Sequence, residues 1–241
     1  MNQSKKIKSR VLLDFHHGMG DELICNGLVR EYCKKYETVG IFCIKRNYPN
    51  VSFMYRDLSN LRIHVVSSHT ERLRFRFLNP LRFGQNRYDE IRAIDGYDEE
   101  SGIRFERQVY EKTFGIPLEK KWDSFFVERD PGREAALLKK TGVTGPFQFM
   151  HDDGRFPLDR SRISQTLPII EPTKELTNNV FDCCGVIEQA SEIHVVDSSF
   201  IVLIDSLPYV NNDQKLYKHQ YARATPAAQS PMLRKPWTIL V

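Results

Sequence analysis

The sequence predicts an α/β protein built from two parallel sheets with helices on both faces. Short apolar runs alternate with amphipathic stretches, which is the pattern of successive strand–helix–strand units. The alternation stops at the breaker-rich segments 130–132 and 141–146 and then starts again. The 241 residues are enough for two compact Rossmann-like domains, which we place at 1–142 and 143–241 with a cleft between them.

The first half is expected to contain a buried strand, a glycine-containing loop and then a helix from about Asp21. Ile24, Leu28 and Tyr32 recur at helical spacing on one face of this helix. Gly27 costs helix stability there, so we expect it to mark a close packing contact. The predicted strands of this half cover 11–15, 39–45, 61–68, part of 88–97 and an aromatic stretch at 124–127.

Between these strands lies the most basic region of the chain. Arg72, Arg74 and Arg76 alternate with apolar residues, which is the period of a strand or an extended edge. One interpretation is a solvated face with an apolar underside. The other is a surface that contacts an anionic acceptor, a polysaccharide or membrane headgroups, which would make the protein peripheral to a membrane.

The second half restarts the alternation after the breakers. The segments 146–154, 166–173 and 192–197 are each expected to contain a strand. Helices are expected over 178–190, capped by Asn178 or Asn179, and over 198–208. The tail is expected to be irregular until Trp237 and the last apolar residues pack back onto the body.

The overall composition is that of an ordinary soluble globular protein, with 41% hydrophobic and 27% charged residues. The formal charge of +4 favours anionic small molecules or an anionic surface over a dedicated nucleic-acid partner. The five cysteines include no CxxC pair, so we expect them to be buried thiols in a reducing compartment. Neither a signal peptide nor a membrane-spanning run is apparent, which predicts a cytoplasmic protein.

The loop after the first strand is a candidate site because ligands bind at strand ends in open α/β sheets. Gly18 and Gly20 allow close backbone approach, although the pattern is neither GxGxxG nor a Walker loop. Asp21 either caps the following helix or faces the cleft as a general base. Of His16 and His17 at most one faces the cleft, and a metal held by the adjacent pair is disfavoured.

A second candidate is the strand end at Asp197, where Ser198 and Ser199 open an amphipathic helix. Two hydroxyls and the free N–H groups of a first helical turn form a seat for a diphosphate, unless the serines act as an ordinary N-cap. The carboxylate of Asp197 would repel a phosphate beside it, so we expect Asp197 to bind hydroxyl groups of a ligand instead.

A third candidate is the segment "HDDGR" at 151–155. Its histidine and two carboxylates suggest a metal–phosphate site. The alternative is a turn before Arg155, which is a natural partner for phosphate.

Two of these segments together resemble the GT-B glycosyltransferases, most nearly the ADP-heptose–lipopolysaccharide heptosyltransferase-like group. Gly18-Met19-Gly20-Asp21 is similar to the family's "GxGD" loop, and "ASEIHVVDSSFIVLIDSLP" from Ala190 is similar to its donor-binding segment. The resemblance implies a GT-B fold with an acceptor-side N-terminal domain and a C-terminal domain that binds the nucleotide-sugar. It also implies inversion by direct displacement without a metal.

The resemblance assigns the catalytic and acceptor side to the opening loop. Asp21 is similar to the residue proposed as the base that deprotonates the acceptor hydroxyl, and we place His17 with it as catalytic. His16, Gly18 and Gly20 would line the acceptor or shape the loop.

The donor side is assigned to the second half in the same way. Ser198 and Ser199 would hold the donor diphosphate, and Asp197 would contact donor sugar hydroxyls. Arg155 would neutralise phosphate, and Glu171 would meet the donor ribose.

The sequence therefore predicts a hexosyl- or heptosyltransferase-type enzyme that moves a sugar from a nucleotide-diphosphate-sugar to a carbohydrate acceptor in glycan biosynthesis. It would need no metal or other cofactor and no nucleic-acid partner. One alternative is a metal-dependent phosphoryl-transfer or hydrolytic enzyme that uses His16, His17, His151, Asp152 and Asp153. The other is a non-catalytic module that binds sugars or nucleotides, because Ser199 stands where the family has glycine.

Overall fold

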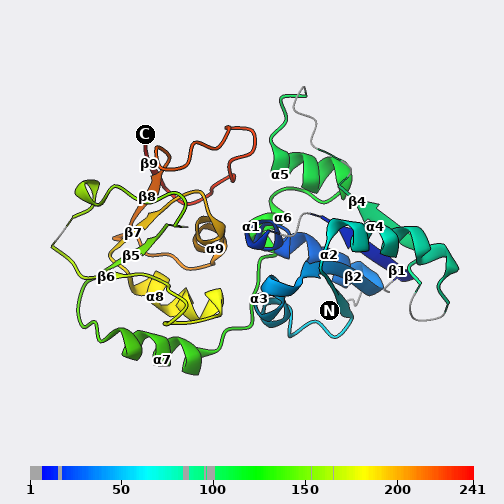
Figure 1. Cartoon of the computed structure of the whole chain (residues 1–241), viewed down its shortest axis with the longest axis horizontal. Coiled ribbons are helices and arrows are strands. Elements are labelled where there is room, and N and C mark those ends of the chain that lie inside the picture. Colours follow the sequence, from blue (N-terminus) through cyan, green and yellow to red (C-terminus); the bar gives the residue numbers. More distant parts are fainter. Residues whose placement is uncertain are drawn as a thin grey trace. The chain divides into compact units, whose positions relative to one another are not determined.

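The computed structural model describes residues 7–15, 18–83, 87–94, 96, 101–152, 154–164 and 166–241. The chain divides into two compact units between Glu128 and Arg129 (Figure 1). The boundary expected at 142/143 lies at the other end of helix α7 (Pro131–Thr141). This helix packs against α8 (Cys184–Gln189), which is why it belongs to the second unit.

The first unit contains a four-stranded parallel sheet with strand order β3-β2-β1-β4. Its elements in chain order are β1 (Ile7–Asp14), α1 (Met19–Ile24), α2 (Asn26–Lys35), β2 (Tyr36–Ile44), η1 (Lys45–Asn47), α3 (Tyr48–Met54), β3 (Leu61–Val66), α4 (His69–Leu78), η2 (Asn79–Leu81), β4 (Glu90–Ala93), α5 (Phe105–Arg107), η4 (Gln108–Thr113) and α6 (Lys120–Asp123). The strands predicted over 11–15, 39–45, 61–68 and part of 88–97 are confirmed. The strand predicted over 124–127 is wrong, because the backbone of Phe126 bonds to the Asn26 side chain instead of to a neighbouring strand.

The centre of this sheet is buried because β1 lies between two other strands. Val11, Leu12 and Leu13 are fully buried, as expected for a parallel strand covered on both faces. Leu12 packs with Phe42 of β2 and other core side chains. Burial along β1 explains why this strand was predictable from an apolar run alone.

The helix expected from Asp21 is interrupted, because the hydroxyl of Tyr110 enters its hydrogen-bond ladder. α1 ends at Ile24 and α2 begins at Asn26. The buried Tyr110 hydroxyl donates to the Ile24 carbonyl at 2.6 Å and accepts from the Leu28 N–H at 3.3 Å. The hydroxyl thus bridges two groups that an unbroken helix would join directly.

The strand or extended edge expected around Arg72–Phe77 is wrong, since these residues form α4. Ser68 is the N-cap, and its hydroxyl accepts from the Glu71 N–H at 3.1 Å. Glu71 in turn accepts from the Ser67 N–H at 2.8 Å. This capping arrangement begins a helix, and the alternation of arginine with apolar residues did not reveal it.

The second unit contains a five-stranded parallel sheet with strand order β6-β5-β7-β8-β9. Its elements after α7 are β5 (Gln148–His151), η5 (Arg160–Arg162), β6 (Ile169–Ile170), η6 (Val180–Cys183), α8, β7 (Glu192–Val195), α9 (Ser199–Ser206), β8 (Lys215–His219) and β9 (Thr238–Leu240). Asn179 caps η6 by accepting from the Phe181 N–H at 3.0 Å. The expected strands and helices of this half are confirmed, but β8 lies in the tail that we expected to be irregular.

The end of the tail is held by Asp205 of α9. The Trp237 indole N–H donates to its carboxylate at 3.0 Å, and the backbone N–H groups of Arg234 and Lys235 donate to it at 2.9 Å. The prediction that Trp237 attaches the tail to the body is therefore confirmed. All five cysteines are free and buried, as expected. Among the described residues, no helix has the length and apolar character needed to cross a membrane.

We expect the packing of Gly27 to limit the stability of the first unit. A Cβ at this position would lie 2.0 Å from the Lys120 carbonyl oxygen, which is backbone and does not yield. The substitution Gly27→Ala should lower the free energy of unfolding by about 1–3 kcal/mol. Urea unfolding followed by circular dichroism measures this loss.

The matched control is Gly132→Ala in α7. The nearest atom to its added Cβ is 3.4 Å away, which is an ordinary contact. This variant should keep or slightly raise the stability, because alanine favours helix over glycine. Equal stability of the two variants would show that the backbone contact at Gly27 relaxes freely.

Candidate functional site

Each sheet has one topological switch point, which is where ligands bind in open α/β folds. In the first sheet, β2 lies on one side of β1 and β4 on the other, so the switch point is at the carboxyl ends of β1 and β4. In the second sheet, β6 and β7 flank β5, so the switch point is at the carboxyl ends of β5 and β7. The sequence-predicted residues Gly18, Asp21, Ser198 and Ser199 follow these strand ends.

Asp21 lies in the first turn of α1 and is half-buried. Gly18 is the N-cap, and no side chain caps this helix. An added Cβ at Gly18 would lie 2.6 Å from Asp21 Oδ2, so glycine leaves the room that this carboxylate occupies. Neither Gly18 nor Gly20 has a positive φ, so neither is required by an unusual backbone conformation.

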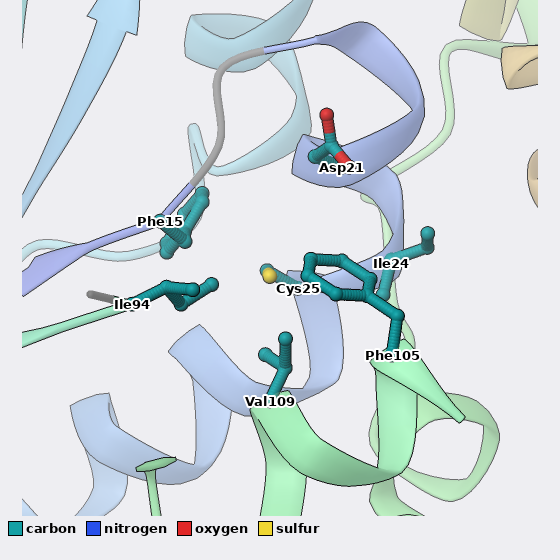
Figure 2. A pocket seen from close by; sticks show the side chains of 7 residues that line it. All are labelled: Phe15, Asp21, Ile24, Cys25, Ile94, Phe105 and Val109. Atoms are coloured by element: carbon teal, nitrogen blue, oxygen red, sulfur yellow. The ribbon is translucent and has the colours of Figure 1, made fainter. Parts of the chain in front are cut away.

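Asp21 borders an apolar pocket at this switch point (Figure 2). Phe15 follows β1, Ile94 follows β4, and Phe105 of α5 completes the wall. The cavity is about 10 Å³, the size of one water molecule. Asp21 therefore combines a carboxylate with an apolar wall, a setting that suits a general base.

Beside Asp21, the side chain of Glu22 is fully buried. Burial, together with the charge of Asp21, raises the pKa of Glu22 well above its ordinary value. Sequence analysis did not single it out, because only the fold shows that it points inward.

Asp14, the last residue of β1, is buried and forms ion pairs with two arginines of α4. Arg72 lies 3.3 Å and Arg76 3.1 Å from its carboxylate oxygens. Burial raises the pKa of Asp14, while the two arginines lower it. Of the three arginines expected to contact an anionic surface, two therefore face Asp14, and Arg74 remains exposed.

At the second switch point, His151 and Ser198 lie close together. His151 ends β5, and its Nδ1 is 3.1 Å from Ser198 Oγ. Ser198 is the N-cap residue of α9, yet its side chain does not cap the helix. The backbone N–H groups of the first turn of α9, which begins at the half-buried Ser199, are therefore not capped by this hydroxyl.

Asp197 precedes this helix, and its carboxylate is engaged inside the unit. Lys218 of β8 donates to Asp197 Oδ2 at 3.3 Å, and Ser230 Oγ donates to the same oxygen at 3.1 Å. All three side chains are buried. Sequence analysis missed Lys218 and Ser230, because β8 was not expected in the tail.

Two arginines, Arg155 and Arg223, lie near the carboxyl ends of β5 and β7. Arg155 is exposed, and its guanidinium lies 5.7 Å from the Phe156 ring centroid. The Arg223 guanidinium lies 5.1 Å from the same ring and donates to the Asp197 carbonyl. Sequence analysis predicted Arg155 and missed Arg223, which follows β8. Together they place positive charge near the strand end before α9.

Glu171 lies elsewhere on this sheet. It follows β6 and accepts from Arg160 at 2.9 Å. It lines a shallow hollow of about 200 Å³ with the end of α7. Because β6 and β7 lie on opposite sides of β5, the structure does not bring Glu171 next to Ser198.

Of the five residues named for a metal-dependent enzyme, the structure describes only His151 and Asp152. His16, His17 and Asp153 lie outside the described residues. Asp152 accepts from the Gly154 N–H at 3.2 Å and the Leu158 N–H at 3.4 Å, so it shapes the loop after β5. Within the described ranges, no three metal-ligating side chains converge on one point.

The chain thus contains two parallel α/β sheets, each with polar groups at its switch point, which is where ligands bind in open α/β folds. The chain is similar to Escherichia coli ADP-heptose lipopolysaccharide heptosyltransferase II, with a TM-score of 0.53 and 10% identity over 97% of this chain and 90% of that chain. It also matches a glycosyl transferase family 9 structure from Veillonella parvula, with a TM-score of 0.49 and 8% identity over 85% of this chain and 80% of that chain. No family model and no curated protein matches it. The first likeness shows a shared fold.

We expect the Lys218–Asp197 pair to be essential for the stability of the second unit. Lys218→Met would leave a buried carboxylate without its cation, which should lower the free energy of unfolding by about 3–5 kcal/mol. The measurement is denaturant unfolding followed by circular dichroism.

Two further variants isolate the pair. Lys215→Met removes an exposed lysine of β8 that pairs with Glu192 of the neighbouring strand β7, and it should cost only about 0–1 kcal/mol. Adding Asp197→Asn to Lys218→Met should restore part of the loss. Equal effects of the Lys215 and Lys218 variants would contradict a stabilising role for the buried pair.

Proposed function

We propose that the chain is a GT-B-type glycosyltransferase that transfers a sugar from a nucleotide-diphosphate-sugar to a carbohydrate acceptor. The fold shared with heptosyltransferase II supports this class of activity. The observation that carries the proposal is the set of anion-binding groups at the switch point of β5 and β7.

Three kinds of group at this edge favour a diphosphate. The first turn of α9 offers backbone N–H groups and the positive end of a helix dipole. Ser198 and Ser199 add hydroxyls, and Arg155 and Arg223 add positive charge. Because Lys218 neutralises Asp197, the carboxylate does not oppose an anion here. These groups would bind the donor and stabilise the leaving nucleoside diphosphate.

We assign the acceptor to the first unit and the base to Asp21. Asp21 would take the proton of the acceptor hydroxyl as its oxygen bonds to the anomeric carbon. The bond from that carbon to the diphosphate oxygen breaks, and the nucleoside diphosphate leaves with its electron pair. One displacement inverts the anomeric centre and requires neither a metal nor another cofactor. Asp21 borders apolar side chains, which supports its use as a base.

The remaining donor residues follow from the same proposal. Arg155 is exposed and available to a phosphate. Asp197, which we expected to contact donor sugar hydroxyls, would instead position this strand end for the donor, because Ser230 and Lys218 hold its buried carboxylate. Glu171 would contact a more distant part of the donor, because it follows the edge-side strand β6.

Donor binding is the first test. Calorimetric titration with adenosine, uridine and guanosine diphosphates and their sugars should identify one base that binds. Arg155→Met and Ser198→Ala should each lower the affinity for that nucleotide about tenfold, because each removes a polar contact to a charged phosphate. Arg155 is exposed, so its variant is expected to fold normally.

The control for charge is Lys215→Met. Lys215 lies at the amino end of β8, whereas the proposed donor groups lie at the carboxyl ends of the strands. This variant should bind the nucleotide as the wild type does. A wild-type protein that binds none of these nucleotides, or equal affinity in all variants, would contradict the donor site.

Turnover tests the base. Asp21→Asn keeps the shape of the side chain but cannot take a proton at neutral pH. It should reduce kcat for sugar transfer about a hundredfold or more, with the donor affinity unchanged. Release of nucleoside diphosphate in the presence of a panel of glycan acceptors measures this rate.

Glu37→Gln provides the matched control, because Glu37 is an exposed carboxylate of β2 in the same unit. Its rate should equal the wild-type rate. Equal turnover by Asp21→Asn would remove Asp21 as the base. Loss of wild-type turnover in EDTA would favour the metal-dependent alternative.

A further inference from the structure

The helix α4 directs two arginines towards the sheet and two large apolar side chains, Leu73 and Phe77, towards solvent. Its charged residues Arg72 and Arg76 turn inward to the buried Asp14. Phe75, also inward, packs edge-on against Phe42 of β2 with ring centroids 5.2 Å apart. These three contacts fix the rotation of the helix about its own axis.

The outward side of α4 and of the following η2 is apolar. Leu73 and Phe77 are four residues apart and lie on one helix face. Leu81 of η2 and Phe83 follow them. Phe77 is 81%, Leu81 68% and Phe83 86% exposed. We call these four residues the α4 apolar surface. Four exposed large apolar side chains within eleven residues of sequence suggest an interaction surface.

The charge around this surface is mainly positive, although the exposed carboxylates of Glu71 and Asp89 flank it. The sequence from Arg72 to Tyr88 contains five arginines and no acidic residue. Arg74 and Arg87 are exposed. Arg82 is half-buried and lies 3.9 Å from the ring of the inward-facing Phe75, so it is not counted with the exposed arginines. A partner must therefore accept phenylalanine and leucine side chains and carry negative charge at its rim.

We propose that the α4 apolar surface binds a membrane that contains anionic phospholipid. Phe77, Leu81 and Phe83 insert at the level of the acyl chains, and Arg74 and Arg87 contact the headgroup phosphates. A second copy of this chain fits less well, because it would bring arginine against arginine. The proposal concerns a surface separate from Asp21 and the diphosphate groups, and it does not depend on the proposed sugar transfer.

Vesicle co-sedimentation tests the proposal with the full chain. The probes are vesicles of phosphatidylcholine alone and vesicles of phosphatidylcholine mixed with phosphatidylglycerol. The wild type should partition about tenfold more strongly onto the mixed vesicles. The double variant Phe77→Ser/Phe83→Ser should lose about tenfold or more of that partitioning. Both side chains are exposed, so we expect the variant to fold, which circular dichroism verifies.

Two other variants complete the design. Val210→Ser removes an apolar side chain of the second unit that is 85% exposed, and it should partition as the wild type does. Arg74→Gln/Arg87→Gln should abolish the preference for the anionic vesicles. Equal partitioning of the phenylalanine variant and the wild type would overturn the proposal. So would wild-type self-association in sedimentation velocity that the phenylalanine variant lacks, since the surface would then be an interface between copies.

Discussion

A buried carboxylate at a strand end must be neutralised, and both units of this protein are arranged around that requirement. Asp14 ends β1 and pairs with Arg72 and Arg76, while Asp197 follows β7 and pairs with Lys218. Removing one partner of a buried pair costs far more than an exposed pair contributes. In the first unit the pairing fixes α4 on the sheet. In the second it fixes β8 beside β7, and with β8 the start of the tail.

The same pairs determine which charges remain available for ligands. Asp197 alone would repel a diphosphate at the start of α9, but its carboxylate is held by Lys218 and Ser230. The helix N-terminus and the two arginines beside Phe156 then dominate this edge. In the first unit the arginines that neutralise Asp14 turn the polar side of α4 inward, which leaves Phe77 on the outer side. Stability and ligand preference therefore follow from the same contacts.

Local sequence patterns predicted the elements whose burial is nearly complete. The apolar run of β1 and the amphipathic spacing of α9 needed no information from distant residues. The failures concern residues whose environment comes from far along the chain. Arg72 and Arg76 alternate as in a strand, and only Asp14 explains their inward direction. A lysine such as Lys218 argues against a buried strand when the sequence is considered alone. In the structure Lys218 is buried in β8 because it pairs with Asp197. Of the polar groups at the strand end before α9, Ser198 was predicted and Arg223 was missed for the same reason.

The position of Asp21 depends on buried contacts even though its carboxylate is half-exposed. The Tyr110 hydroxyl interrupts the helix after Ile24, so α1 is a short separate turn that packs against α5 and η4 residues. Gly27 lets α2 approach the Lys120 backbone more closely than any residue with a Cβ could. These contacts hold the first turn, and Gly18 leaves space for the carboxylate. A general base needs this combination, because its position must be fixed while the proton it accepts comes from outside. Gly18 of the opening loop is therefore best understood through the space that it leaves for Asp21.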